Sequence, residues 1–125
     1  MTPRDHFDAA VIQQWLIDRG FSSRDWGLLH AALERPWASF RGEDFYPDPI
    51  SKAGALFHSI SSSHPLIDGN KRLAVHLSIW MLRVHGISDA VIHDDAWFEL
   101  AVKAAAGDMS AEECSSFLRE LLHDG

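Results

Sequence analysis

Residues 64–72 read His-Pro-Leu-Ile-Asp-Gly-Asn-Lys-Arg and lead directly into an amphipathic helical pattern over residues 73–85. A glycine-containing loop that feeds a helix presents unpaired backbone N–H groups and the positive end of the helix dipole to an anion. Lys71 and Arg72 add full positive charge at the same point. The stretch therefore predicts an anion site between two helices.

Two other side chains of this stretch add chemistry to the anion site. Asp68 is placed to hold a divalent cation against the oxygens of the anion. His64 is the group of the loop that can take up a proton near neutral pH. A phosphate site with a metal ligand and a base is the outline of a phosphoryl- or nucleotidyl-transfer site.

The same residues also have purely structural explanations. An imidazole at position 64 can cap the carbonyl groups at the end of the preceding helix. Asp68 can form an Asx-turn or cap the following helix, and Asn70 can serve as an N-cap as well. Arg72 can form a surface salt bridge. The residue types alone leave both a functional site and a capped helix junction open.

The order of the residues resembles the signature of the Fic/Doc family, His-Pro-Phe-x-Asp/Glu-Gly-Asn-Gly/Lys-Arg. The chain has His64, Pro65, Asp68 and the run 69–72 in register with it. Flanking segments of Doc-type proteins are similar to residues 24–29 (Arg-Asp-Trp-Gly-Leu-Leu), 32–36 (Ala-Leu-Glu-Arg-Pro) and 100–108 (Leu-Ala-Val-Lys-Ala-Ala-Ala-Gly-Asp). The resemblance therefore covers most of the chain.

Three positions depart from the signature of the Fic nucleotidyl transferases, and two of them bear on the branch of the family. Lys71 resembles the Doc (death-on-curing) branch, because Fic nucleotidyl transferases typically carry glycine there. Val75 stands where those enzymes have a second arginine, so the chain has one fewer clamp for a polyphosphate. Leu66 replaces the usual phenylalanine, which is a tolerable apolar change at a position that packs inward. Lys71 and Val75 favour a Doc-like toxin kinase over an adenylyltransferase.

The resemblance implies an enzyme that transfers the γ-phosphate of ATP to a hydroxyl of a target protein, with elongation factor Tu as the candidate. It implies a Mg²⁺–nucleotide requirement, with His64 as general base and Asp68 as metal ligand. The phosphate-binding residues that it implies are Gly69, Asn70, Lys71 and Arg72. A cognate antitoxin is implied as the neutralising partner. Two alternatives are a Fic-type protein adenylyltransferase and a catalytically silent binding module.

Regulation is expected to act in trans. Without a second arginine in the signature, a glutamate lock within the same chain has no obvious partner. We therefore expect an antitoxin segment to lie as a helix in an apolar groove near the loop. The aromatic residues of the segment 37–50 are expected to contribute to this groove: Trp37, Phe40, Phe45 and Tyr46.

Length and composition exclude several other classes. The 125 residues predict one domain over 1–125, and a net charge of −7 argues against nucleic acid as a partner. The lone cysteine, Cys114, cannot form an internal disulfide and is interpreted as a packing residue, which suits a reducing cytoplasm. The polar first eight residues give no sign of a signal peptide, and no apolar run reaches the roughly 20 residues that span a bilayer.

The hydrophobic pattern predicts a mainly α fold, a bundle of about six helices with the loop 64–69 between two central ones. Helices are expected over residues 7–19, 25–34, 51–62, 70–85, 94 or 95 to 106, and 110–122, with an extended segment over 87–93. Ser22 or Ser23 is the expected cap of the second helix, and Ser110 with Glu113 is the expected capping box of the last helix. Residues 37–50 are expected to form an irregular flap with a short hairpin. Residues 70–85 are apolar almost all round, which predicts burial at the centre of the bundle.

Overall fold

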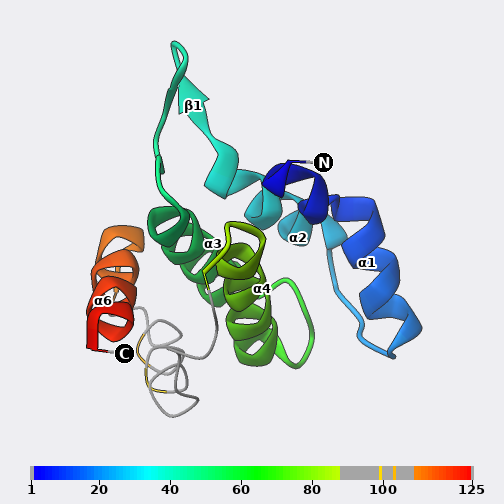
Figure 1. The fold of residues 1–125 in the computed structure, drawn as a ribbon. Helices are drawn as coiled ribbons and strands as arrows, with labels where there is room; N and C mark the ends of the chain where they lie inside the picture. Colours follow the sequence, from blue (N-terminus) through cyan, green and yellow to red (C-terminus); the bar gives the residue numbers. More distant parts are fainter. Residues whose placement is uncertain (1, 88–98, 100–102, 104–108, 125) are drawn as a thin grey trace.

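The computed structural model describes residues 2–87, 99, 103 and 109–124, and these residues are mainly helical, as predicted (Figure 1). The 3₁₀-helices are η1 (Pro3–Phe7) and η2 (Arg35–Trp37). The α-helices are α1 (Ala9–Asp18), α2 (Trp26–Glu34), α3 (Pro49–Ser63), α4 (Asn70–Val84) and α6 (Ala111–Asp124). The strands are β1 (Ser39–Phe40) and β2 (Glu43–Asp44).

Four of the α-helices begin at a side-chain cap that satisfies a free backbone N–H of the first turn. Asp8 accepts from the N–H of residue 11 in α1, Asp25 from that of residue 27 in α2, and Asp48 from that of residue 51 in α3. Ser110 and Glu113 form the predicted reciprocal capping box at the start of α6, with distances of 3.1 and 3.2 Å. These caps explain where the helices start.

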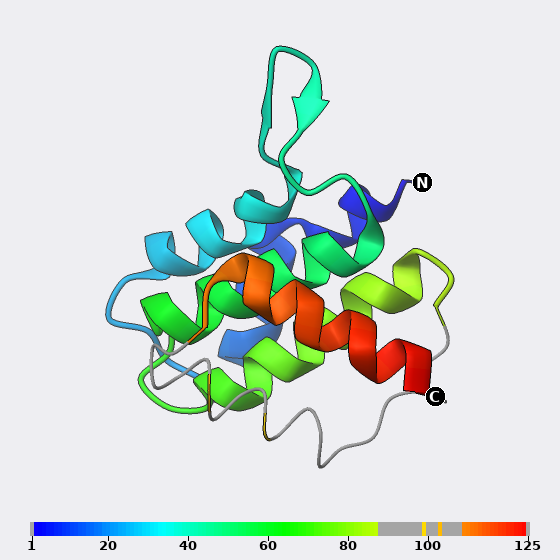
Figure 2. The same ribbon diagram turned by 90° about the vertical axis from the view of Figure 1, so that its left-hand side faces the viewer.

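Helix α3 lies at the centre, between α4 on one side and α6 on the other (Figures 1 and 2). Its fully buried side chains include Leu56, Phe57 and Ile60. Helix α6 approaches closely, because a Cβ placed at Gly54 would lie 2.1 Å from Oγ of Ser115. Cys114 packs in the same core, and burial raises the pKa of its thiol to about 11, which agrees with a packing residue.

The prediction that residues 70–85 are buried all round is wrong. Helix α4 buries one face against α3, through Leu73, Leu77 and Met81 among others, and leaves Trp80 38% exposed. Three apolar residues of α4, Leu77, Ile79 and Trp80, line a groove together with residues of α1. The central position belongs to α3.

The predicted flap is a short antiparallel hairpin that projects from the helical body (Figure 2). Ser39 pairs with Asp44 and Phe40 with Glu43. The buried Lys52 of α3 anchors it: its ammonium donates to the carbonyl of residue 46, lies 3.6 Å from the Asp44 carboxylate and 5.4 Å from the centre of the Trp37 ring. The hairpin therefore leaves the body at the N-terminal end of α3.

Other boundaries differ in part from the sequence expectation. Helix α2 is capped by Asp25, so the expectation of Ser22 or Ser23 as its cap is wrong. Helix α3 begins at Pro49, two residues earlier than expected, because Asp48 caps it and proline suits its first position. The extended segment expected over 87–93 and the helix expected up to residue 106 lie almost wholly outside the described residues.

No helix within the described ranges is long and apolar enough to cross a membrane. The caps and the α3-centred packing together fix the position of the loop between α3 and α4, where the sequence places the candidate chemistry.

Candidate functional site

The loop over residues 64–69 joins the C-terminus of α3 to the N-terminus of α4 (Figure 1). His64 is the C-cap of α3: its backbone N–H donates to the carbonyl of Ile60 at 3.1 Å, and its φ and ψ of 50° and 62° are left-handed. Its imidazole is exposed and makes no hydrogen bond to any described residue, so the capping is done by the main chain alone. The side chain is therefore available to a ligand.

Apolar residues anchor the middle of the loop. Pro65 and Leu66 are buried, and Leu66 belongs to the same core as α3 and α4, as expected for an inward-facing position. Ile67 and Asp68 point the other way and are exposed. The loop thus turns its carboxylate toward solvent while its apolar side fixes it to the bundle.

Asn70 closes the loop with a pair of hydrogen bonds. Its Oδ1 accepts from the N–H of Leu66 at 2.8 Å, and its Nδ2 donates to the carbonyl of Leu66 at 2.8 Å. Asn70 is the first residue of α4, so the interpretation of Asn70 as an N-cap is wrong. The amide has two N–H groups, which leaves one donor for a phosphate oxygen while the other shapes the loop.

The start of α4 is open. Its N-cap is Gly69, at a φ of 94°, and no side chain caps the helix, so the alternative of Asp68 as a cap is wrong. The backbone N–H groups of residues 70–72 have no acceptor among the described residues. Lys71 and Arg72 are exposed and form no ion pair with any residue that the structure describes, so the alternative of a surface salt bridge at Arg72 is not seen there. Free N–H groups and two cationic residues thus share the first turn of α4, an arrangement that suits an anion.

The segment between α1 and α2 braces the loop, which the sequence did not reveal (Figure 2). The N–H of Ile67 donates to the carbonyl of Ser22 at 2.9 Å, and the Ser23 hydroxyl donates to the carbonyl of Pro65. A Cβ placed at residue 69 would lie 2.8 Å from Cε1 of Phe21, so only glycine fits beneath this ring. Nothing in the linear sequence signals contacts between segments more than forty residues apart.

His58 illustrates how a second imidazole of α3 differs from that of His64. Burial, together with the nearby Arg35 guanidinium, lowers the pKa of His58, against a smaller opposite effect of Glu112. Its Nδ1 lies 3.5 Å from a guanidinium nitrogen of Arg35. The neutral form of His58 is thus favoured and its ring is engaged within the bundle, whereas the imidazole of His64 is exposed.

A metal ion would have one protein carboxylate at this site. No group of three or more metal-binding side chains occurs among the described residues. Mg²⁺ is commonly held by one or two carboxylates together with substrate phosphates and water rather than by an all-protein cage. The exposed Asp68, which precedes the uncapped start of α4 by two residues, fits this manner of binding.

Fold and loop together define a helical protein in which a loop with an exposed imidazole leads into an uncapped helix. Residues 5–82 match the model of the Fic/DOC family, and the chain belongs to this family. Members of the family are generally transferases that use ATP and typically a divalent metal. The chain is 38% identical over 99 residues to the protein named Toxin Doc of Mycolicibacterium smegmatis (strain ATCC 700084 / mc(2)155), an alignment that covers 75% of this chain and 76% of that protein.

Proposed function

We propose that this protein is a toxin that transfers the γ-phosphate of ATP to a hydroxyl of a target protein in the cytoplasm, with elongation factor Tu as the candidate target. The observation that carries the proposal is the open start of α4, where unpaired N–H groups, Lys71 and Arg72 meet next to the exposed imidazole of His64. The similarity to a protein named as a toxin supports the toxic outcome.

In the proposed reaction the acceptor oxygen forms a bond to the γ-phosphorus, and the bond from that phosphorus to the bridging oxygen of ADP breaks. His64 takes the proton of the acceptor hydroxyl. Gly69, Asn70, Lys71 and Arg72 bind the phosphate oxygens and offset their charge. Asp68 would hold Mg²⁺, and the ion would supply neutralisation of the negative charge on the phosphates. ADP and the phosphorylated protein are the products.

Adenylyl transfer is the alternative, and Lys71 and Val75 argue against it. Lys71 occupies the place of the glycine over which the nucleotide of Fic enzymes lies, and its side chain adds bulk and charge at the rim of the site. Val75 is half-buried against the core and offers no cation where those enzymes have an arginine. We propose that the nucleotide binds reversed, with its terminal phosphate nearest His64.

The test is transfer of label to the target from ATP labelled on the α- or on the γ-phosphate. The proposal expects γ-label alone from the unmodified protein. Lys71→Gly should weaken phosphorylation and allow α-label, whereas the matched variant Lys71→Met keeps the bulk without the charge and should exclude α-label. Label from the α-phosphate with the unmodified protein would establish adenylyl transfer. Label from neither phosphate, in the presence of a competent target, would favour the catalytically silent module.

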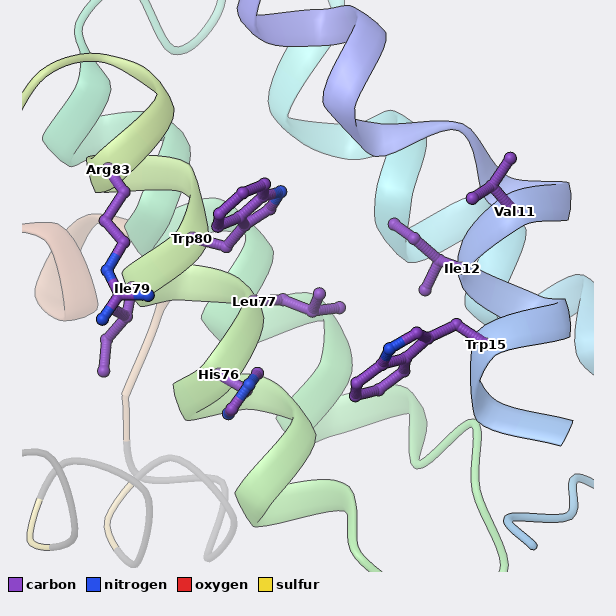
Figure 3. A pocket seen from close by; sticks show the side chains of 8 residues that line it. All are labelled: Val11, Ile12, Trp15, His76, Leu77, Ile79, Trp80 and Arg83. Carbon is purple, nitrogen blue, oxygen red and sulfur yellow. The ribbon is translucent and has the colours of Figure 1, made fainter. Parts of the chain in front are cut away.

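We further propose that the cognate antitoxin neutralises the toxin by placing a helix in the groove between α1 and α4. This groove has a volume of about 470 Å³, and Figure 3 shows Trp80 and Leu77 of α4 facing Ile12 and Trp15 of α1. Trp15 and Trp80 are each 38% exposed. An apolar groove with two exposed tryptophan walls suits the apolar face of an amphipathic helix.

Charge and position support this occupant. His76 lines the groove and Arg72 lies one turn before it on α4, so this side of the groove is basic although the chain as a whole carries −7. An antitoxin helix with carboxylates beside its apolar face is therefore complementary. Arg72 and His76 are four residues apart on α4, so they share a helix face, and a segment in the groove that extends along α4 reaches the anion site.

Two variants test whether the antitoxin binds in the groove or at the flap. Trp80→Ser should weaken antitoxin binding by about 10-fold or more, because buried tryptophans are frequent hot spots of interfaces. Phe45→Ser removes an aromatic residue of the flap that is 63% exposed, and it should leave binding unchanged. Loss of binding in Phe45→Ser alone would overturn the groove and favour the flap, whose contribution stays a prediction from the sequence.

A further inference from the structure

The backbone of His64 has a conformation that its surroundings must hold in place. Its φ of 50° is left-handed, and residues with a Cβ rarely adopt this region. Such a conformation persists where several neighbouring contacts hold the backbone in place. The preceding helix supplies one contact, the bond from the N–H of His64 to Ile60. The residues that follow His64 must supply the others.

Those contacts come from two sides. From within the loop, the amide of Asn70 bonds to both backbone groups of Leu66. From outside, the Ser23 hydroxyl donates to the carbonyl of Pro65, the residue next to His64, and the carbonyl of Ser22 accepts from the N–H of Ile67. The loop is thus clamped between the start of α4 and the segment that joins α1 to α2.

Ser23 is itself held firmly. Its Oγ accepts from the N–H of Asp25 at 3.0 Å, and Asp25 caps α2 by accepting from the N–H of Gly27 at 2.9 Å. A chain of hydrogen bonds therefore runs from the first turn of α2 through the Ser23 hydroxyl to the peptide that follows Pro65. Ser23 and Pro65 are 42 positions apart in the sequence, so this bond is a long-range tertiary contact.

We propose that Ser23 is a positioning residue for the transfer reaction, and that its hydroxyl fixes the Pro65 carbonyl and thereby the placement of the His64 imidazole. This inference rests on the proposed reaction, since it assigns to Ser23 a part in aligning its base. Without the hydroxyl, the carbonyl of the buried Pro65 loses its partner, and the loop relaxes toward an ordinary backbone conformation at residue 64. The nucleotide phosphates contact α4 rather than Ser23, so alignment suffers more than nucleotide binding.

Ser23→Thr and Ser23→Val form the decisive pair, because they have nearly the same shape and differ by the hydroxyl. Ser23→Val should lower kcat for phosphate transfer by about 10-fold, as expected for a buried acceptor left without its donor, and leave KM for ATP within about 2-fold. Ser23→Thr should retain most of the activity. Ser62→Ala is the control, because its hydroxyl bonds to the carbonyl of His58 on the exposed side of α3. Equal kcat for Ser23→Thr and Ser23→Val would overturn the proposal.

Amide hydrogen exchange tests the clamp without any activity. In Ser23→Val the amides of Leu66 and Ile67 should exchange about 10-fold faster than in Ser23→Thr, while those of the core of α3 keep their rates. Faster exchange with no phosphate transfer even by the unmodified protein would remove the proposed reaction and, with it, the catalytic part assigned to Ser23. Unchanged exchange at residues 66 and 67, or equally faster exchange throughout the bundle, would overturn the clamp itself.

Discussion

Helices α3 and α4 lie side by side and each contain 15 residues, yet their first turns use polar groups in opposite ways. At the start of α3, Asp48 and Ser51 bond reciprocally, and Asp48 also pairs with Arg119 of α6 at 2.7 Å. At the start of α4, Gly69 offers no cap, and the cations of the first turn have no partner among the described residues.

The difference separates stability from function. A capped first turn satisfies its own N–H groups and stabilises the fold, whereas an uncapped one leaves them to a ligand. Positive side chains in the first turn of a helix oppose the helix dipole, so Lys71 and Arg72 are unfavourable for α4 until an anion binds. The start of α3 therefore belongs to the scaffold and the start of α4 to the site.

Removal of the imidazole of His64, in the loop that leads into the uncapped helix α4, should have the largest effect on phosphate transfer. His64→Ala should lower phosphate transfer by about 10²–10⁴-fold, as is typical for loss of a general base. The helical circular dichroism should not change, because the His64 imidazole bonds to none of the described residues. Transfer rates on purified protein check this. A folded His64→Ala protein with near-normal transfer would exclude the assigned role.

The next effect concerns the metal. Asp68→Asn should raise the Mg²⁺ concentration for half-maximal transfer by about 10-fold, or about 1.4 kcal/mol of binding free energy, because an amide neutralises a hard cation less well than a carboxylate. Stability should be unaffected, since Asp68 caps no helix. Coinciding Mg²⁺ titrations of the two proteins would show that the carboxylate does not bind the metal.

At the capped start of α3 we expect a smaller effect, and one on stability rather than on activity. Asp48→Ala should lower the free energy of unfolding by about 1 kcal/mol, as for other lost N-caps, and leave the KM for ATP unchanged. Urea denaturation and transfer kinetics on the same preparation measure both quantities. If the KM changed while stability did not, the division between the two helix starts would be wrong.

The smallest effect is a pH dependence. Burial alone would raise the pKa of Asp48, but the Ser51 N–H and Arg119 outweigh it and lower that pKa. A carboxyl with a lowered pKa stabilises the fold above its unfolded pKa of about 3.9, and this contribution is lost as the pH falls through the folded value. The stability advantage over Asp48→Asn, which still caps the helix, should therefore be present at pH 7 and shrink below about pH 4.

Local signals in the sequence located most of the scaffold. The capping box at Ser110, the loop between two helices and the short flap were all predicted, since each depends on residues close together in the chain. The start of α3 was missed by two residues, although Asp48 followed by Pro49 carried the signal for it. The family resemblance of the loop was confirmed by the match over residues 5–82.

The long-range contacts could not be predicted from the sequence. Two serines before a helix look like caps, and only the tertiary structure shows that the Ser23 hydroxyl turns instead to the carbonyl of Pro65. The exposed face of α4 was not predicted, for a related reason. Its apolar residues read as core, because the sequence does not distinguish a face that packs on α3 from one that lines a groove beside α1.

Substitutions in the segment between α1 and α2 should form a recognisable pattern in a genetic selection. If expression of the protein stops growth, survivors will carry loss-of-function substitutions wherever the loop depends on a side chain. Phe21 contacts the loop through its ring and Ser23 through its hydroxyl, but Ser22 contributes only its backbone carbonyl. Survivors should therefore be frequent at positions 21 and 23 and rare at the serine between them.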